Sequence, residues 1–166
     1  MKDEQLRILK TMHEATNRMD LHMFAEAVHL TPNEAIADVQ ELAKEGFLHK
    51  VGAGYGLTEK GKNALKTPTA VPPEKTFQFY IGVDRPLGFS ATSLEEFYRQ
   101  IKQVCSDSLY FHLYRGDFEG WLDQVIGDKQ LADEVGGFKA SGINGEELRK
   151  ALLKALDQRY GIGDLL

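Results

Sequence analysis

The sequence is poor in cysteine and in long apolar runs, and each shortage excludes a class of protein. Cys105 is the only cysteine, so an internal disulfide and a cysteine-based zinc site are both excluded. No apolar run approaches the roughly 18 residues that a membrane span needs. The charged start, MKDEQLRILK, lacks the apolar core of a signal peptide. These shortages predict a cytoplasmic protein with no membrane partner.

Motifs that bind nucleotides or metals are missing as well. The sequence has no phosphate-binding loop and no glycine-rich dinucleotide fingerprint. Its five histidines are scattered, without carboxylate or thiol partners at the spacing of metal ligands. We therefore expect no metal, no cofactor and no catalytic residue.

The composition is that of a globular protein with two parts. Hydrophobic residues make up 42% of the chain and charged residues 27%, and the net charge is −5. A dedicated nucleic-acid binder is usually basic, so this sign argues against extensive phosphate contacts. The segment KTPTAVPPEKT, residues 66–76, holds three of the five prolines and reads as a boundary. We predict one domain over 1–66, a linker over 67–76 and a second domain over 77–166.

Apolar periodicity in the first part predicts three helices. Thr31 is a good N-cap for the third, Glu34 completes a capping box, and Gly46 follows its end near Glu45. The inward positions are expected to be Leu6, Leu9, Met12 and Thr16 in the first helix, Leu21, Phe24 and Val28 in the second, and Ala35, Ile36, Val39, Leu42 and Ala43 in the third.

A hairpin follows the third helix. FLHKV and YGLT are expected to be its strands, GAG its turn, and Thr58 the cap of a short closing helix, EKGKNALK. The stretch ELAKEGFLHKV…YGLTEKGKNAL resembles the helix, wing and closing helix of prokaryotic transcription regulators of the multiple-antibiotic-resistance and phenolic-acid-regulator families. The resemblance covers residues 4–66. It implies a winged helix-turn-helix that binds double-stranded DNA, as a homodimer, with the third helix in the major groove.

The residues expected to contact DNA follow from that resemblance. Asn33 and Gln40 are the expected base readers, and Lys44, Lys50, Lys60 and Lys62 are the expected phosphate contacts. The third helix also carries an acidic row, Glu34, Asp38, Glu41 and Glu45, which a phosphate-lined groove repels. The alternative is a protein-interaction adaptor that binds no DNA and whose acidic third helix meets a basic protein partner.

The second part is expected to be a mainly helical α+β domain. FQFYIGV reads as a strand, DRPLGF as a loop, and LEEFYRQIKQV as a helix capped by Ser93. SLYFHLYR fits a strand or a helix equally well, whereas the pattern is helical from Asp117, and a last helix is expected from about Gly145 to Tyr160. The segments SLEEFYRQIKQV, SLYFHLYRGDFEGWLDQVIGDKQLADEV and LRKALLKAL resemble an uncharacterised prokaryotic domain family over residues 77–160. That resemblance implies no reaction. The whole chain is predicted to be mostly α with small β.

One cluster in this part has residues suited to ligand binding. HLYRGDFEGW brings His112, Arg115, Asp117 and Trp121 within ten residues, so acid–base chemistry or anion binding is conceivable there. An enzyme would require His112 and Asp117 to meet in a cleft. The plainer interpretation makes Asp117 an N-cap, Trp121 a core residue and His112 a buried, hydrogen-bonded side chain. The leading hypothesis is a DNA-binding regulator whose second domain dimerises or senses a ligand.

Overall fold

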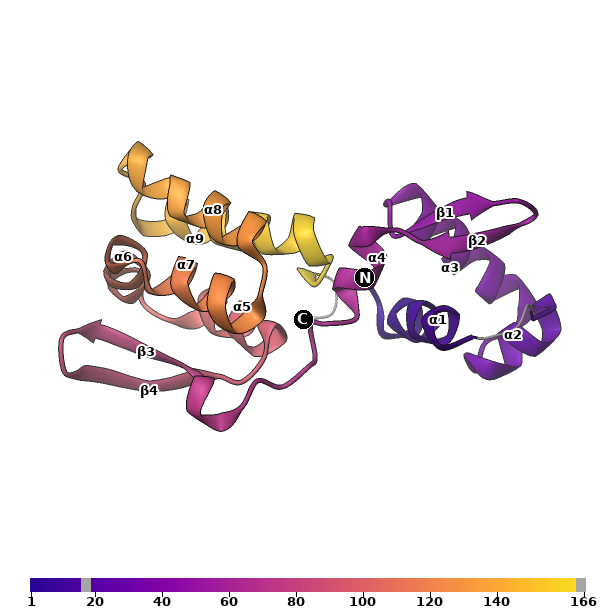
Figure 1. Ribbon diagram of the computed structural model, residues 1–166, viewed down its shortest axis with the longest axis horizontal. Coiled ribbons are helices and arrows are strands. Elements are labelled where there is room, and N and C mark those ends of the chain that lie inside the picture. The colour runs from indigo at the N-terminus through magenta and orange to yellow at the C-terminus, as the bar shows by residue number, and fades with distance from the viewer. Residues whose placement is uncertain (16–18, 164–166) are drawn as a thin grey trace. The chain divides into compact units, whose positions relative to one another are not determined.

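The structure is a computed structural model that describes residues 1–15 and 19–163. It divides into two compact units, the first ending at Lys66 and the second beginning at Thr67. Each is mainly helical and contains an antiparallel sheet of two strands (Figure 1). The predicted fold class, mostly α with small β, is confirmed. Thr16 and the last three residues of the predicted second domain lie outside the described residues.

Three helices open the first unit: α1 (Asp3–Glu14), α2 (Leu21–Ala27) and α3 (Pro32–Lys44). The predicted capping box starts α3. The Glu34 N–H donates to Thr31 Oγ1, and the Thr31 N–H donates to the Glu34 carboxylate over 2.9 Å. The backbone N–H and then the hydroxyl of Thr31 lower the pKa of Glu34, which keeps this carboxylate ionised at the start of the helix.

A hairpin and a short helix complete the first unit. Strand β1 (Leu48–Val51) pairs with β2 (Gly54–Leu57), with Leu48 opposite Leu57 and Lys50 opposite Tyr55, and α4 (Glu59–Ala64) follows. Because successive side chains of a strand alternate between faces, Lys50 and Tyr55 share the face of the buried Leu48. Three helices, a hairpin and a short helix is the order of elements that the sequence predicts for this part.

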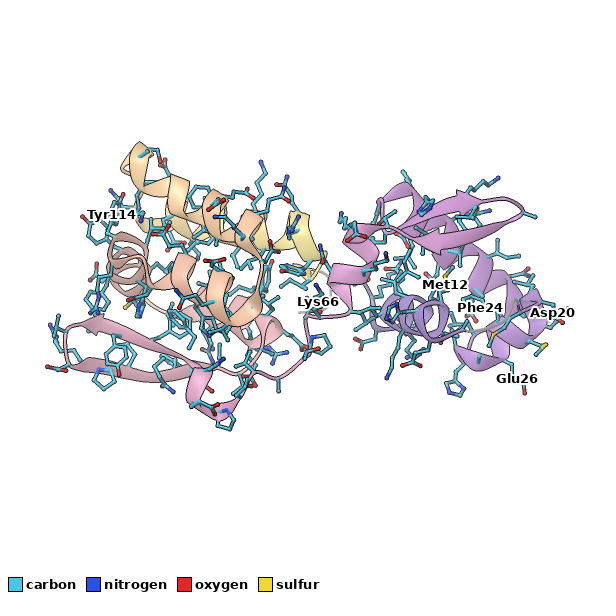
Figure 2. All side chains as sticks on the ribbon, viewed as in Figure 1. Met12, Asp20, Phe24, Glu26, Lys66 and Tyr114 are labelled. Atoms are coloured by element: carbon cyan, nitrogen blue, oxygen red, sulfur yellow. The ribbon has the colours of Figure 1, made fainter. Side chains whose placement is uncertain are left out.

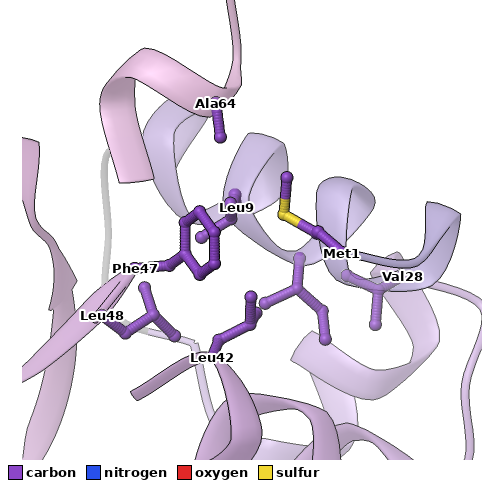
Figure 3. Close-up of a cluster of buried hydrophobic side chains, with 8 residues drawn as sticks. Met1, Leu9, Val28, Leu42, Phe47, Leu48 and Ala64 are labelled. Atoms are coloured by element: carbon purple, nitrogen blue, oxygen red, sulfur yellow. The ribbon is translucent and has the colours of Figure 1, made fainter. Parts of the chain in front are cut away.

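The helices and the hairpin of the first unit meet in one apolar core (Figure 3). Its buried members are Met1, Ile8, Leu9, Val28, Leu42, Phe47, Leu48 and Ala64. Two residues predicted to face inward do not: Leu21 and Ile36 are each 39% exposed. On α3 the core is reached by Ala35 and Leu42, and Ile36 lies a further 100° around the helix, toward its outer face.

Thr58 and Gly61 fix α4 on the start of β1. The Thr58 hydroxyl donates to the Gly46 carbonyl over 2.6 Å and accepts the Gly61 N–H over 3.1 Å. A Cβ on Gly61 would lie 2.3 Å from the Phe47 carbonyl oxygen, closer than two such atoms can approach. The glycine of the Leu-Thr-Glu-Lys-Gly motif is therefore required by packing.

Gly61→Ala is expected to destabilise the first unit by about 1–3 kcal/mol, because α4 must move off the Phe47 carbonyl. The only tryptophan, Trp121, belongs to the second unit, so hydrogen–deuterium exchange of α4 and β1 is the suitable measurement. The exposed neighbour Lys62 provides the control, since Lys62→Ala should change stability by no more than about 0.5 kcal/mol. Unchanged exchange in the glycine variant would contradict the packing argument.

The second unit starts with a hairpin of its own, β3 (Phe77–Gly82) and β4 (Arg85–Ala91). The prediction that DRPLGF forms a loop is wrong, since most of it lies in β4. Asp84 takes up a φ of 55° in the tight turn between the strands. Proline and glycine suggest a loop, but an edge strand tolerates both, and β4 is paired on one side only.

Five α-helices follow the hairpin in the part of the second unit that the structure describes, residues 67–163. They are α5 (Leu94–Gln103), α6 (Ser106–Arg115), α7 (Asp117–Trp121), α8 (Lys129–Gly137) and α9 (Gly145–Tyr160), with a π-helical turn over Leu122–Ile126 and 3-10 turns over Pro73–Lys75 and Phe138–Ser141. The ambiguous segment SLYFHLYR is the helix α6, in which Leu109, His112 and Leu113 are buried at helical spacing and Gly116 ends the helix. The last helix has the predicted bounds.

Helix α6 closes the outer edge of β3. Ser108 Oγ donates to the Tyr80 carbonyl over 2.7 Å, and the Tyr80 N–H donates to His112 Nε2 over 2.8 Å. Both groups that Tyr80 would offer to a further strand are thus bound by side chains of a helix. Since Ser108 and His112 are buried, these bonds are shielded from water.

A carboxylate joins the start of α8 to the end of α9. Asp128 caps α8 by accepting the Leu131 N–H, and it receives two hydrogen bonds from Arg159, over 2.7 and 2.9 Å. The Tyr160 hydroxyl donates to the same carboxylate over 2.5 Å. The buried Asp128 carboxylate thus accepts four hydrogen bonds, two on each oxygen, which matches its roughly four lone-pair sites.

The segment 67–76, which we expected to be a linker, is attached to the second unit. Thr67 is buried and its carbonyl accepts the Glu95 N–H, while the Val71 N–H donates to the Thr92 carbonyl. Further along, the Lys75 carbonyl accepts the indole N–H of Trp121 over 2.8 Å. A proline-rich composition suggests a flexible linker. The composition alone does not show that the backbone of this segment is hydrogen-bonded to the second unit.

Candidate functional site

One side of α3 is exposed and carries both expected base readers. Asn33, Ala37, Gln40 and Lys44 recur at intervals of three or four residues, and all are exposed. Ile36 lies beside them and is exposed too. We call these five residues the reading face. Apart from Lys44 it is uncharged.

The acidic row of α3 lies on another flank of the helix. The side-chain amide of Gln5, which is only 2% exposed on α1, donates to the Glu41 carboxylate over 2.7 Å and to that of Asp38 over 3.4 Å. Glu34 is held by Thr31 in the capping box. Glu34, Glu41 and Glu45 are exposed, as the sequence analysis expects, and Asp38 is half-buried. Gln5 holds the carboxylates of Asp38 and Glu41 on the side of α3 that faces α1.

Gln5 is a residue that the sequence analysis missed. Its signal is a polar side chain four residues before Leu9, on the apolar stripe of the first helix. A buried amide needs partners for its N–H groups, and here the carboxylates of α3 provide them.

An apolar groove of about 380 Å³ adjoins the reading face. Met12 and Phe24, labelled in Figure 2, line it, as do Ile36 and Gln40 of α3 and Tyr55 of β2. The remaining lining residues are Ala15, Met19, Asp20, Leu21, Ala35, Val39 and Gly54. Among the lining residues that the structure describes, Asp20 is the only charged one, and this part of the groove suits an apolar group.

The four lysines expected to contact phosphates fall into two pairs. Lys60 donates to the Glu45 carbonyl over 3.1 Å and lies over the Phe47 ring, and Lys62 pairs with Glu59 over 3.1 Å. Lys44 and Lys50 are exposed and make no ion pair within residues 1–15 and 19–163. Lys44 ends the reading face, and Lys50 stands opposite Tyr55 on the hairpin. These two are the better phosphate candidates.

In the second unit the structure brings His112 and Asp117 together. His112 Nδ1 lies 2.8 Å from Asp117 Oδ2, and the other ring nitrogen, Nε2, accepts the Tyr80 N–H. An Nε2 that accepts must be unprotonated, so Nδ1 carries the hydrogen that points to Asp117. Burial lowers the pKa of His112, against the raising influence of Asp117, so the ring is neutral at neutral pH.

This geometry fits a structural role for His112. Both ring nitrogens are engaged, so neither is free to take a proton from a substrate. Asp117 is not the N-cap that we considered, because Gly116 occupies that position and the Asp117 carboxylate turns to His112 instead. The predicted core role of Trp121 agrees with its burial and with its bond to Lys75.

The four residues of the expected ligand cluster nevertheless border one cleft of about 620 Å³. Arg115 stacks on the Phe111 ring, and its Nε lies 3.6 Å from Asp117 Oδ2. Arg115 and Asp117 are the charged members of the cluster that solvent reaches. Elsewhere in residues 1–15 and 19–163, no three histidine, cysteine or acidic side chains gather closely enough to hold a metal ion, and no helix is long and apolar enough to cross a membrane.

Comparison with known families concerns the second unit. The profile of a family of unknown function (DUF5752) matches residues 74–164, more than half of the 166 residues. The chain belongs to the DUF5752 family. The sequence analysis expects the second part to resemble an uncharacterised family, and the match to a family of unknown function agrees with that expectation. The match begins at residue 74, just before the β3–β4 hairpin, and includes α9, so the cleft lies in the DUF5752 part and the reading face lies outside it. No curated protein and no solved structure matches the chain.

Proposed function

We propose that the chain is a DNA-binding transcription regulator whose first unit acts as a winged helix. The observation that carries the proposal is the bond from Gln5 to Glu41 and Asp38. Gln5 holds these two carboxylates on the α1 side of α3. The reading face, which would enter the major groove, therefore offers amide side chains and one lysine. Asn33 and Gln40 would contact bases, and Lys44 and Lys50 would contact phosphates.

The proposed regulator is a homodimer, because a two-fold protein matches the two halves of a palindromic site. One unit with few free lysines gives few phosphate contacts, and two copies double their number. The DUF5752 unit would supply the dimer contacts or sense a ligand in the cleft bordered by Arg115 and Asp117.

Titration of the full chain into a fluorescent random duplex, followed by anisotropy at several salt concentrations, tests this function. Binding should weaken as salt increases, because each phosphate contact releases counterions. Lys44→Ala and Lys50→Ala should each reduce the slope of log affinity against log salt by about 1. Lys150→Ala, at an exposed lysine of α9, is the control and should leave the slope unchanged.

A protein-interaction module is the second candidate, and exposed apolar side chains favour it. Met19, Leu21 and Met23 are 38%, 39% and 58% exposed beside the apolar groove. Contiguous exposed apolar surface is typical of protein contacts. Absence of duplex binding even at low salt would reject the DNA-binding function and favour this alternative.

A further inference from the structure

We infer that the reading face selects A·T base pairs, with Ile36 contacting the methyl group of thymine and Asn33 and Gln40 binding adenine. The inference rests on the proposed DNA-binding function and names the class of sequence that such a protein would bind.

The exposure of Ile36 is the first observation. A large aliphatic side chain stands 39% exposed on the outer side of α3, where the core contacts are made by Ala35 and Leu42. Asn33 precedes it by three residues and Gln40 follows it by four, so all three share one surface. On the major-groove edges of the bases, the only apolar group is the C5-methyl of thymine. The reading face therefore pairs an apolar contact with two amide side chains.

The groove next to Ile36 is the second observation. Ile36, Gln40 and Tyr55 are among the residues that line a space of about 380 Å³. A methyl group directed at Ile36 would enter an apolar recess and lose its contact with water. The neighbouring amide of Gln40 can donate to adenine N7 and accept from its N6 amino group, the bidentate pattern that marks this base.

The residues that read the other base pair are missing from this surface. Guanine is bound most often by arginine, and α3 has no arginine. Cytosine is bound through its amino group by carboxylates, but Asp38 and Glu41 are held by Gln5 on the α1 side. Lys44, the one cation of the reading face, is at the last position of α3, one turn beyond Gln40 and farthest from the N-terminal end at which a recognition helix contacts bases.

Three 20-base-pair duplex pools test the inference with the full chain. One is randomised over A·T pairs, one is the same pool with deoxyuridine in place of thymidine, and one is randomised over G·C pairs. Deoxyuridine removes the major-groove methyl and leaves the minor-groove pattern intact. We expect the A·T pool to bind at least ten-fold more tightly than the G·C pool, the value of one bidentate base contact.

The deoxyuridine pool tests the contact between Ile36 and the thymine methyl group separately from the other base contacts. It should bind roughly three- to five-fold more weakly than the A·T pool, the value of one buried methyl group. In Ile36→Ala this difference should vanish, and in Gln40→Ala the preference for A·T over G·C should fall. Phe89→Ala is the matched control, because Phe89 on β4 is 40% exposed and belongs to the second unit.

Each other outcome contradicts a defined part of the inference. Equal, salt-dependent binding of the three pools would overturn the A·T selection and leave the DNA-binding function standing. If the A·T pool is preferred but its affinity changes neither with deoxyuridine nor in Ile36→Ala, the methyl contact would be overturned. Failure to bind any pool at low salt would overturn both the inference and the function on which it rests.

Discussion

Asp128→Ala is expected to lower the free energy of unfolding of the second unit by about 2–4 kcal/mol, from the loss of a helix cap and of charged hydrogen bonds to a partner, Arg159, that is 28% exposed. The carboxylate accepts two hydrogen bonds from Arg159, one from the Tyr160 hydroxyl and one from the Leu131 N–H. The variant therefore loses a helix cap and removes the acceptor of three side-chain donors. Urea unfolding followed by the fluorescence of Trp121, the only tryptophan, measures this unit.

Asp128→Asn separates the charge from the cap. Asparagine still caps α8, so Asp128→Asn should lose less stability than Asp128→Ala.

The pH dependence of stability gives a second test. Burial acts to raise the pKa of Asp128, but its hydrogen bonds with Arg159, Tyr160 and Leu131 lower it below the ordinary 3.8. The unfolded state then binds the proton first as pH falls. The stabilisation is therefore complete above pH 3.8 and is lost as pH falls through the folded-state pKa. Equal stability of the alanine variant and the parent chain would contradict this account.

His112→Ala is expected to destabilise the same unit by about 3–5 kcal/mol, as for an aromatic ring removed from a core. The imidazole lies among Phe77, Phe79 and Phe118, with ring centroids 4.9 to 5.8 Å away. The variant also leaves the Tyr80 N–H without its acceptor, a penalty included in that range. His112→Gln restores an acceptor for the Tyr80 N–H and should recover part of the loss, whereas His112→Phe restores the ring alone.

The same histidine predicts a loss of stability in mild acid. Burial holds the pKa of His112 below its ordinary 6.5. Below pH 6.5 the histidine is therefore protonated in the unfolded chain while it is still neutral in the folded protein. Stability should decline from pH 6.5 down to the folded-state pKa, where the loss is complete. His112 is the only histidine after residue 66, so the second unit of His112→Gln should lack this decline. A parent protein whose midpoint in urea is constant from pH 7.5 to 5 would contradict the neutral, buried state of the ring.

The sequence predicts those elements whose signals are local. The capping box of Thr31 and Glu34 and the periodicity of α9 each determine a helix from within a few residues. The secondary structure of SLYFHLYR could not be predicted, because its alternating aromatic and aliphatic residues suit both a strand and a helix. Its helical state depends on distant partners, since Ser108 and His112 bind Tyr80, some thirty residues earlier.

The candidate site was predictable in its residues but not in their orientation. The spacing of Asn33 and Gln40 places them on one surface of a helix. No pattern within α3 shows that Asp38 and Glu41 turn toward Gln5, because that residue lies on another helix. Similarly, Asp117 at the start of a helical pattern suggests a cap, whereas its nearest partner in space is His112.

The closure of β3 by α6 bears on how the protein behaves when concentrated. A two-stranded sheet has two open edges, and an open edge can recruit a strand from another molecule. With the Tyr80 N–H and carbonyl bound to His112 and Ser108, one edge is blocked at its centre by a helix of the same chain. Protonation of His112 removes the acceptor of the Tyr80 N–H and so weakens this block, while Ser108 still holds the Tyr80 carbonyl. Acidification should therefore promote self-association through β-strand pairing, at the same pH at which the second unit loses stability.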